Sequence, residues 1–127
     1  MLADQPAFWL IDIDRCRCVD RGRWSGVDAR ASESDLGLIR ESTEGLFYAR
    51  GRGIVENGAA FDTMKITRAG TARVCNFAFD LARQRKAQGK RGHVTNVDKA
   101  NVFTSMAFWR EVFLERAEAF PDITFDH

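Results

Sequence analysis

Two short polar clusters contain most of the residues in this sequence that could perform chemistry. The first runs from Val97 to Asn101 and places Lys99 between an aspartate and an asparagine at the end of a short apolar run. The second runs from Arg40 to Gly45 and directly follows the apolar run Leu36–Ile39. Enzymes of the α/β class present reactive groups in this way, at the carboxyl ends of strands. Together the two clusters predict a site for an anionic substrate.

Arg40 is the candidate for substrate binding in the second cluster. Its planar guanidinium can hold a carboxylate through two parallel hydrogen bonds. The alternative is a salt bridge with Glu41 or Glu44, both of which lie within four residues. The residue types alone leave both interpretations open.

Lys99 is the candidate for proton transfer in the first cluster. Burial at a strand end would favour its neutral amine and let it exchange protons at neutral pH. The neighbouring Asp98 could instead hold it charged in a structural ion pair. Asn101 offers an amide to a ligand, or it caps the helix that begins a few residues later.

The cysteines and histidines give weaker signals. Cys16 and Cys18 could supply two soft metal ligands, but no histidine or second cysteine pair stands at structural-zinc spacing, which favours two ordinary thiols. Cys75 falls on the apolar side of an expected helix and is predicted to be a core residue. His93 and His127 have no partners at triad or metal-ligand spacing, so we assign them no role.

Apolar periodicity predicts an α/β layer in which helices cross over between strands. The glycines at 51–53 and the Asn57-Gly58 pair indicate turns around an irregular connection. The first helix follows Thr67, its expected N-cap, and stops at Gly89. The apolar faces expected on the two helices are Val74, Phe77, Ala78, Leu81 and Ala82, and then Trp109, Val112, Phe113, Ala117 and Phe120. The expected strands or extended segments are 7–13, 36–39, 61–66, 93–97 and 123–125, and the second helix begins near Thr104 or Ser105.

Composition excludes several classes of function. At 127 residues the chain is long enough for one domain with a core. Its formal net charge of +1 gives no overall attraction to nucleic acid or to acidic membranes. No apolar run approaches the roughly 20 residues that span a bilayer, and the start lacks the features of a signal peptide. We therefore expect a cytoplasmic protein with reduced thiols, without nucleic-acid or membrane partners.

From Leu36 to His127 the sequence resembles the middle of the β-decarboxylating dehydrogenases, the family of isopropylmalate, isocitrate and tartrate dehydrogenases. Four motifs in matching order and spacing carry the resemblance: Ile39–Gly45, Val97–Val102, Phe108–Arg110 and Phe120–Asp122. It implies an α/β fold with helices packed on a sheet, like the central dimer-forming domain of these enzymes. We expect residues 35–127 to form part of such a domain, and residues 1–34 to be an unassigned N-terminal segment with one strand.

The resemblance also implies a function. Members of this family oxidise a small 2-hydroxy acid with NAD or NADP and Mg²⁺ or Mn²⁺, usually with loss of carbon dioxide, and they act as homodimers. Arg40 matches an arginine that binds the substrate's carboxylate. Lys99 matches the lysine that transfers the proton of the substrate hydroxyl, reaching across the dimer, and Asn101 matches a residue near the nicotinamide.

Three departures from the family pattern limit this implication. Phe47 stands where the family usually has a catalytic tyrosine, and Tyr48 is one residue away, which in an extended segment would turn it to the opposite face. The first 34 residues do not resemble the family's first half. The sequence ends at Asp126-His127, before the expected metal-binding aspartates, so no metal ligand is assigned in this chain.

Two hypotheses follow from the resemblance and its departures. In the first, the chain is a fragment of a metal-dependent hydroxy-acid dehydrogenase, without activity by itself and without cofactor binding of its own. The alternative is a non-catalytic dimerisation or binding module derived from that family.

Overall fold

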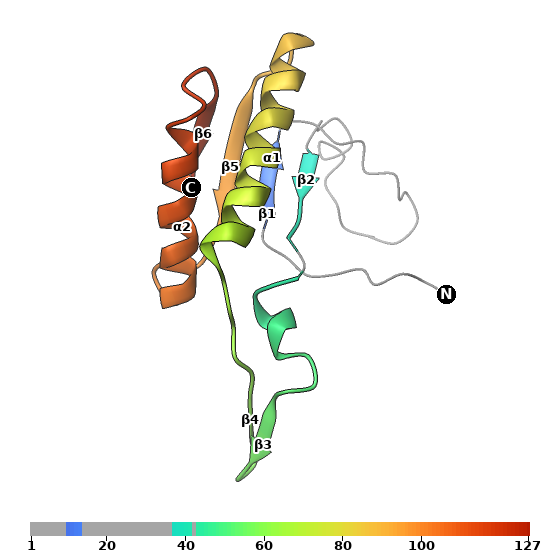
Figure 1. The fold of residues 1–127 in the computed structure, drawn as a ribbon, viewed down its shortest axis with the longest axis vertical. Coiled ribbons are helices and arrows are strands. Elements are labelled where there is room, and N and C mark those ends of the chain that lie inside the picture. The colour runs from blue at the N-terminus through green and yellow to red at the C-terminus, as the bar shows by residue number, and fades with distance from the viewer. Residues whose placement is uncertain (1–9, 14–36, 42) are drawn as a thin grey trace, which may run out of the picture.

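The computed structural model describes residues 10–13, 37–41 and 43–127. Its main sheet has four strands in the order β2-β1-β5-β6 (Figure 1). Strand β1 is antiparallel to both β2 and β5, whereas β5 and β6 are parallel. The strands are β1 (Leu10–Ile13), β2 (Gly37–Ile39), β5 (His93–Val97) and β6 (Thr124–Asp126). The expected α/β sheet with helices packed on it is therefore confirmed.

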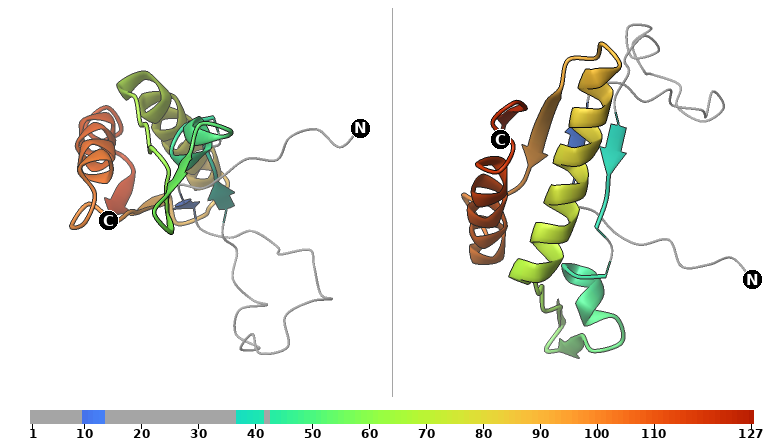
Figure 2. Two further views of the ribbon diagram at one scale, coloured as in Figure 1. Left: turned by 90° about the horizontal axis from the view of Figure 1, so that it is seen from below. Right: turned by 45° about the horizontal axis from the view of Figure 1, so that its top comes forward.

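The two helices lie side by side on one face of the main sheet (Figures 1 and 2). Helix α1 spans Arg68–Ala87 and helix α2 spans Thr104–Ala117. Between them and the sheet lies the core, in which the ring of Phe79 stacks on Phe113 at 5.4 Å and on Phe120 at 5.1 Å between centroids. This core holds β5 and α2 in fixed positions, and the Lys99 cluster lies between them.

Helix α1 begins where its sequence predicts, because the Thr67 side chain accepts a hydrogen bond from the Gly70 N–H as an N-cap. It ends at Ala87, just before Gly89, which has a φ of +80°. The buried face of α1 is rotated relative to the expected one. Phe77 was expected in the core but is 60% exposed, and Phe79 is fully buried instead, whereas Cys75 is buried as predicted. Burial raises the pKa of the Cys75 thiol to about 12.

Helix α2 agrees with the sequence pattern except that it ends at Ala117, so Phe120, expected on its apolar face, follows the helix. It starts at Thr104 and buries Trp109, Val112, Phe113 and Ala117. The chain then returns through the buried Phe120 to β6, which is parallel to β5. The β5-α2-β6 segment is thus a crossover unit of the predicted kind.

A hairpin arm extends away from the main sheet between β2 and α1 (Figure 1). It contains a short 3-10 helix, Leu46–Ala49, and the strands β3 (Ile54–Glu56) and β4 (Ala59–Phe61). The Asn57-Gly58 turn between the strands has φ values of +50° and +76°, which suit a two-residue hairpin loop. The connection expected to be irregular is therefore a hairpin, and of the predicted extended segment 61–66 only Phe61 lies in a strand.

The other expectations for extended segments hold where the structure describes the chain. Strand β1 covers the second half of the predicted strand 7–13, and residues 7–9 lie outside the described residues. Cys16 and Cys18 lie outside them as well. In the described part of the chain, neither helix is long and apolar enough to cross a membrane.

Candidate active site

The two polar clusters follow the carboxyl ends of β2 and β5, and these two strand ends lie at the same edge of the main sheet. Strands β2 and β5 run in the same direction because each is antiparallel to β1 between them. In the register of the sheet, Ile39 pairs with Ile11, and Ile11 pairs with Asn96. With neighbouring strands about 4.8 Å apart, the chain leaves β2 at Arg40 about 10 Å from where it leaves β5 after Val97. The strand ends that carry the two polar clusters of the sequence therefore lie close together at this edge.

Arg40 borders an open groove between β2 and α1. The groove has a volume of about 530 Å³, and its lining includes Leu38, Arg40, Arg73 and Phe77. Leu38 and Phe77 are both more than half exposed. The lining also includes the Glu41 carboxylate, which pairs with Arg73 at 3.2 Å, so the groove combines a paired arginine and Arg40 with apolar surface, a lining compatible with a small organic acid.

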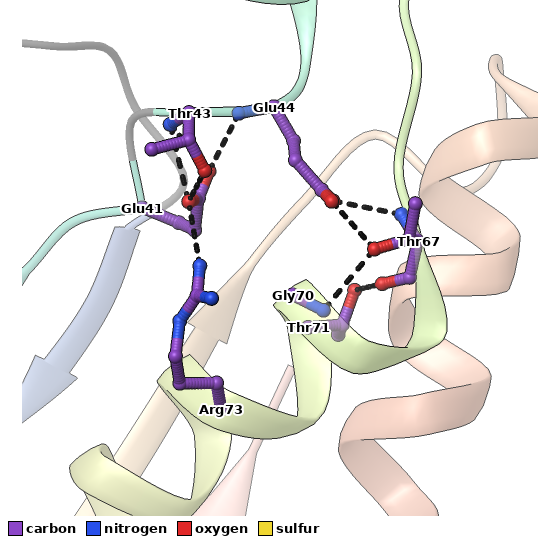
Figure 3. A network of polar contacts seen from close by, with 7 residues as sticks. All are labelled: Glu41, Thr43, Glu44, Thr67, Gly70, Thr71 and Arg73. Atoms are coloured by element: carbon purple, nitrogen blue, oxygen red, sulfur yellow. Dashed lines mark hydrogen bonds and ion pairs between the residues drawn. The ribbon is translucent and has the colours of Figure 1, made fainter.

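Glu41 anchors the loop that follows Arg40 (Figure 3). Its carboxylate is only 6% exposed and accepts hydrogen bonds from the backbone N–H groups of Thr43 and Glu44, at 3.0 Å each, and from the Thr43 hydroxyl. Arg73 of α1 completes the set with an ion pair at 3.2 Å. These contacts fix the loop in place beside Arg40.

Glu44 joins the same loop to the start of α1 (Figure 3). Its carboxylate accepts hydrogen bonds from the Thr67 N–H at 2.8 Å and from the Thr67 hydroxyl at 2.5 Å. The Thr67 hydroxyl oxygen accepts the Gly70 N–H at 3.1 Å. The loop and the helix N-cap are therefore one hydrogen-bonded unit, and the first turn of α1 positions the loop that carries Arg40.

Gly70 gives a test of this unit. A glycine-to-alanine change inside a helix usually stabilises it by up to about 1 kcal/mol. Here a Cβ on Gly70 would lie 2.7 Å from the Glu44 carboxyl carbon, so the carboxylate must move and lose its charge-assisted bonds to Thr67, worth about 1.5–3 kcal/mol. We expect Gly70→Ala to lower the free energy of unfolding by about 1 kcal/mol in urea denaturation.

The matched control for Gly70→Ala is the same change in a Glu44→Ala background. Without the Glu44 carboxylate the three atoms nearest to the added methyl group are gone, so we expect the second change to become neutral or stabilising. Equal losses in both backgrounds would show that the Glu44 contact is not the cause.

In the first cluster, Lys99 and Asp98 do not pair with each other. The Asp98 side chain is fully buried and binds Arg110 of α2, with 2.9 Å from Nε to Oδ2 and 2.5 Å from a terminal nitrogen to Oδ1. Lys99 is exposed, so the burial expected from its position at a strand end is absent in the single chain. Asn101 is exposed as well and is not the helix cap, since Phe103 occupies the N-cap position.

The pKa of Asp98 follows from two opposing effects. Burial, the largest single effect, raises the pKa, but the hydrogen bonds from Arg110, Ala100 and Asn96 together lower it below its usual range. A lowered pKa in the folded state means that Asp98 stabilises the fold above its unfolded pKa and loses this contribution as the pH falls through the folded pKa. The cluster is therefore most stable with Asp98 ionised, at neutral pH.

The structure changes the geometry expected for Tyr48. Phe47 and Tyr48 lie in the 3-10 helix Leu46–Ala49, not in an extended segment, so adjacent side chains point about 120° apart and not to opposite faces. Two cations lie over the Tyr48 ring, Arg52 at 4.9 Å and Lys65 at 4.7 Å from its centroid. Phe47 is half-buried.

Sequence reasoning missed the partners of Asp98. Asn96 and Trp109 are buried and hydrogen-bonded to each other at 2.7 Å, and Asn96 also donates to Asp98 at 2.6 Å. An asparagine inside an apolar strand was the available signal, because such a residue needs a buried partner. The described ranges 10–13, 37–41 and 43–127 bring no three His, Cys, Asp or Glu side chains together as a possible metal site.

Comparison with known proteins identifies relatives along most of the chain. A model of the isocitrate/isopropylmalate dehydrogenase family matches residues 16–127. The 3-isopropylmalate dehydrogenase of Desulfotalea psychrophila is 44% identical over 96 residues, and that of Bacillus caldotenax is 42% identical over 95 residues. Each match covers 73% of this chain but only 26% and 25% of the two relatives, so the chain spans about a quarter of their length.

Solved structures agree with these sequence matches. The isocitrate dehydrogenase of Methylococcus capsulatus superposes with a TM-score of 0.61 at 27% identity, covering 93% of this chain and 33% of that one. A β-decarboxylating dehydrogenase of Thermococcus kodakarensis gives a TM-score of 0.55 at 27% identity, covering 93% and 30%. The two solved structures are therefore of the same group of enzymes as the relatives found by sequence.

Proposed function

This chain belongs to the isocitrate/isopropylmalate dehydrogenase family, and from that premise we propose that it supplies one part of the active site of an NAD(P)- and metal-dependent hydroxy-acid dehydrogenase. In this proposal Arg40 binds a carboxylate of a small 2-hydroxy acid, and Lys99 exchanges the proton of the hydroxyl that is oxidised. Asn101 lies near the nicotinamide. The remaining parts of the site, including the metal ligands, come from outside the described residues.

The observation that carries the proposal is the shared edge of the main sheet. The register of β2, β1 and β5 brings the ends of β2 and β5 within about 10 Å of each other. Arg40 and Lys99 both follow strand ends on this side of the sheet, so a cation for a carboxylate and a base for a hydroxyl are presented there, the lysine serving the partner's site if it reaches across the dimer as the family resemblance implies. The apolar surface of Leu38 and Phe77 beside Arg40 is compatible with an alkyl substituent on the acid.

The first expected result is that the 127-residue chain alone does not reduce NAD or NADP with isopropylmalate, tartrate or isocitrate and Mg²⁺ or Mn²⁺. A metal in this chemistry polarises the substrate oxygen and stabilises the transition state by several kcal/mol, and the described residues gather no such ligands. The measurement is absorbance at 340 nm. Metal-dependent turnover by the pure chain would contradict the division of the site.

The complementary experiment exchanges the matched segment of the 44% identical isopropylmalate dehydrogenase for the corresponding residues of this chain. The transplant is made with Phe47 and with Phe47→Tyr, which restores a phenol at the family position. We expect the Phe47→Tyr transplant to oxidise a hydroxy acid and the Phe47 form to be slower. A folded Phe47→Tyr transplant without activity on any of the three acids would contradict the proposed function.

The hairpin arm favours a second function, dimerisation. Its side chains Ile54, Val55 and Phe61 are 59%, 81% and 54% exposed, which is unusual for a hairpin that stays in water. We propose that the chain forms a homodimer in which this arm packs against the partner. Such an interface would also serve a non-catalytic module.

The dimer is tested by sedimentation of the chain at micromolar concentration. We expect a dimer, and we expect Val55→Asp to shift the equilibrium toward monomer by at least about tenfold, because it places a charge in an apolar contact. The control is Gln84→Asp, which adds the same charge at an exposed position of α1. A stable wild-type monomer, or equal effects of the two changes, would contradict an arm-mediated dimer.

A further inference from the structure

The carboxylate of Asp98 is saturated with hydrogen bonds. Oδ1 accepts from Arg110 at 2.5 Å and from the Ala100 N–H at 2.9 Å, and Oδ2 accepts from Arg110 at 2.9 Å and from Asn96 at 2.6 Å. An ionised carboxylate has about four lone-pair sites. Because all of them are used, Asp98 has no acceptor position left for the ammonium group of Lys99, its neighbour in the sequence.

The orientation of Asn96 in this network is fixed by chemistry. The indole nitrogen of Trp109 can only donate, so it must face the Asn96 carbonyl oxygen, 2.7 Å away. The Asn96 amide nitrogen then faces Asp98, which as an ionised carboxylate can only accept. With Asn96 and Trp109 2% and 1% exposed, the network is shielded from water and its geometry is specific.

The network also determines where Lys99 lies. The Ala100 N–H bond to Asp98 holds the turn on one side, and the Lys99 carbonyl accepts the N–H groups of Val102 and Phe103 at 2.9 and 3.0 Å on the other. The backbone of Lys99 is therefore fixed while its side chain is exposed. In the ranges that the structure describes, no hydrogen bond or ion pair occupies its ammonium group.

We propose that Arg110 and Asn96 are positioning residues for Lys99. They occupy acceptor positions of the Asp98 carboxylate, and the Lys99 side chain therefore stays available to an anionic ligand. This inference rests on the proposed function in that it concerns the same lysine. It adds that Arg110 of α2 acts on Lys99 through Asp98, the preceding residue. In this proposal neither Arg110 nor Asn96 contacts the ligand itself. A network that merely anchored α2 to β5 would affect stability and leave the properties of Lys99 unchanged.

The test measures how fast acetic anhydride labels Lys99 in the folded 127-residue chain at pH 8, resolved by peptide mass spectrometry. Arg110→Gln removes the guanidinium and opens acceptor positions on Asp98, which then pairs with Lys99 and favours its unreactive ammonium form. We expect the labelling rate of Lys99 to fall by about three- to tenfold, since one logarithmic unit of proton affinity is a tenfold change in the amine fraction. The control is Arg68→Gln, which removes an arginine of α1 that binds Glu111 and Glu115 of α2, the helix that carries Arg110. Its effect should stay within about twofold.

Circular dichroism checks that each variant is folded. If Arg110→Gln is not, Arg110→Lys decides the question, because it keeps the charge but loses the two-pronged contact and should slow labelling about two- to threefold. Unchanged labelling in whichever of these variants is folded, or equal slowing by Arg68→Gln, would overturn the inference. Labelling requires neither substrate nor turnover, so its failure leaves the proposed function intact, whereas an active Lys99→Met transplant would overturn the proposed function alone.

Discussion

Replacing Lys99 with methionine in the Phe47→Tyr transplant is expected to lower kcat by about 10²- to 10⁴-fold, the usual contribution of a positioned proton-transfer group. Methionine preserves most of the length and apolar volume of lysine but cannot accept or donate a proton. Because the oxidation of an alcohol requires a proton acceptor beside the departing hydride, the loss should appear in kcat more than in KM. Steady-state rates with saturating cofactor measure it.

Arg40→Gln in the same transplant should give a different kinetic signature. The arginine binds the substrate before and during the reaction, so its loss should raise KM and lower kcat/KM by about 10- to 150-fold, corresponding to a charge-assisted hydrogen bond of about 1.5–3 kcal/mol. The control for both variants is Lys90→Met. Lys90 precedes β5 at the opposite edge of the sheet, and its replacement should leave both constants within about twofold. A Lys99→Met transplant as active as its parent would remove Lys99 from the proposed site.

Where local signals dominate, the sequence was sufficient to predict the structure. Thr67 caps α1 because its hydroxyl reaches the Gly70 N–H within one turn, and β5 covers the predicted span 93–97 between Gly92 and Asp98. Such features depend on residues within about four positions of each other. The Asn57-Gly58 hairpin also had a local signal, but its strands are only three residues each and show little alternation, so the turn residues alone did not indicate it.

The parts of the site that could not be predicted depend on contacts between distant segments. Asp98 has Lys99 beside it in the sequence, yet it binds Arg110, because α2 folds back and delivers a two-pronged donor to a buried carboxylate. A guanidinium satisfies such a carboxylate better than an ammonium, which prefers to stay hydrated. Similarly, the common edge of Arg40 and Lys99 requires β1 to insert between β2 and β5, a pairing across more than 80 residues of sequence. No local pattern encodes that register.

Trp109→Ala should be the most destabilising single change at this site. The side chain is 1% exposed and packs in the core, so its loss leaves a cavity that costs about 3–5 kcal/mol. It also leaves the buried carbonyl of Asn96 without its donor, which costs about 1–3 kcal/mol more. Since domains of this size are stable by only about 5–15 kcal/mol, the variant should lose a large part of its free energy of unfolding.

Two further variants separate the cavity from the hydrogen bond. Trp109→Phe keeps much of the ring volume and removes the indole N–H, so it should lose only about 1–3 kcal/mol in urea denaturation followed by circular dichroism. Phe108→Ala removes a neighbouring, half-buried aromatic ring that lies against Arg68, and it should lose only about 1–2 kcal/mol. If Trp109→Ala lost no more than Phe108→Ala, the buried Trp109–Asn96 contact would not hold α2 against β5. The Asp98 carboxylate would then need another explanation for its fixed position beside Lys99.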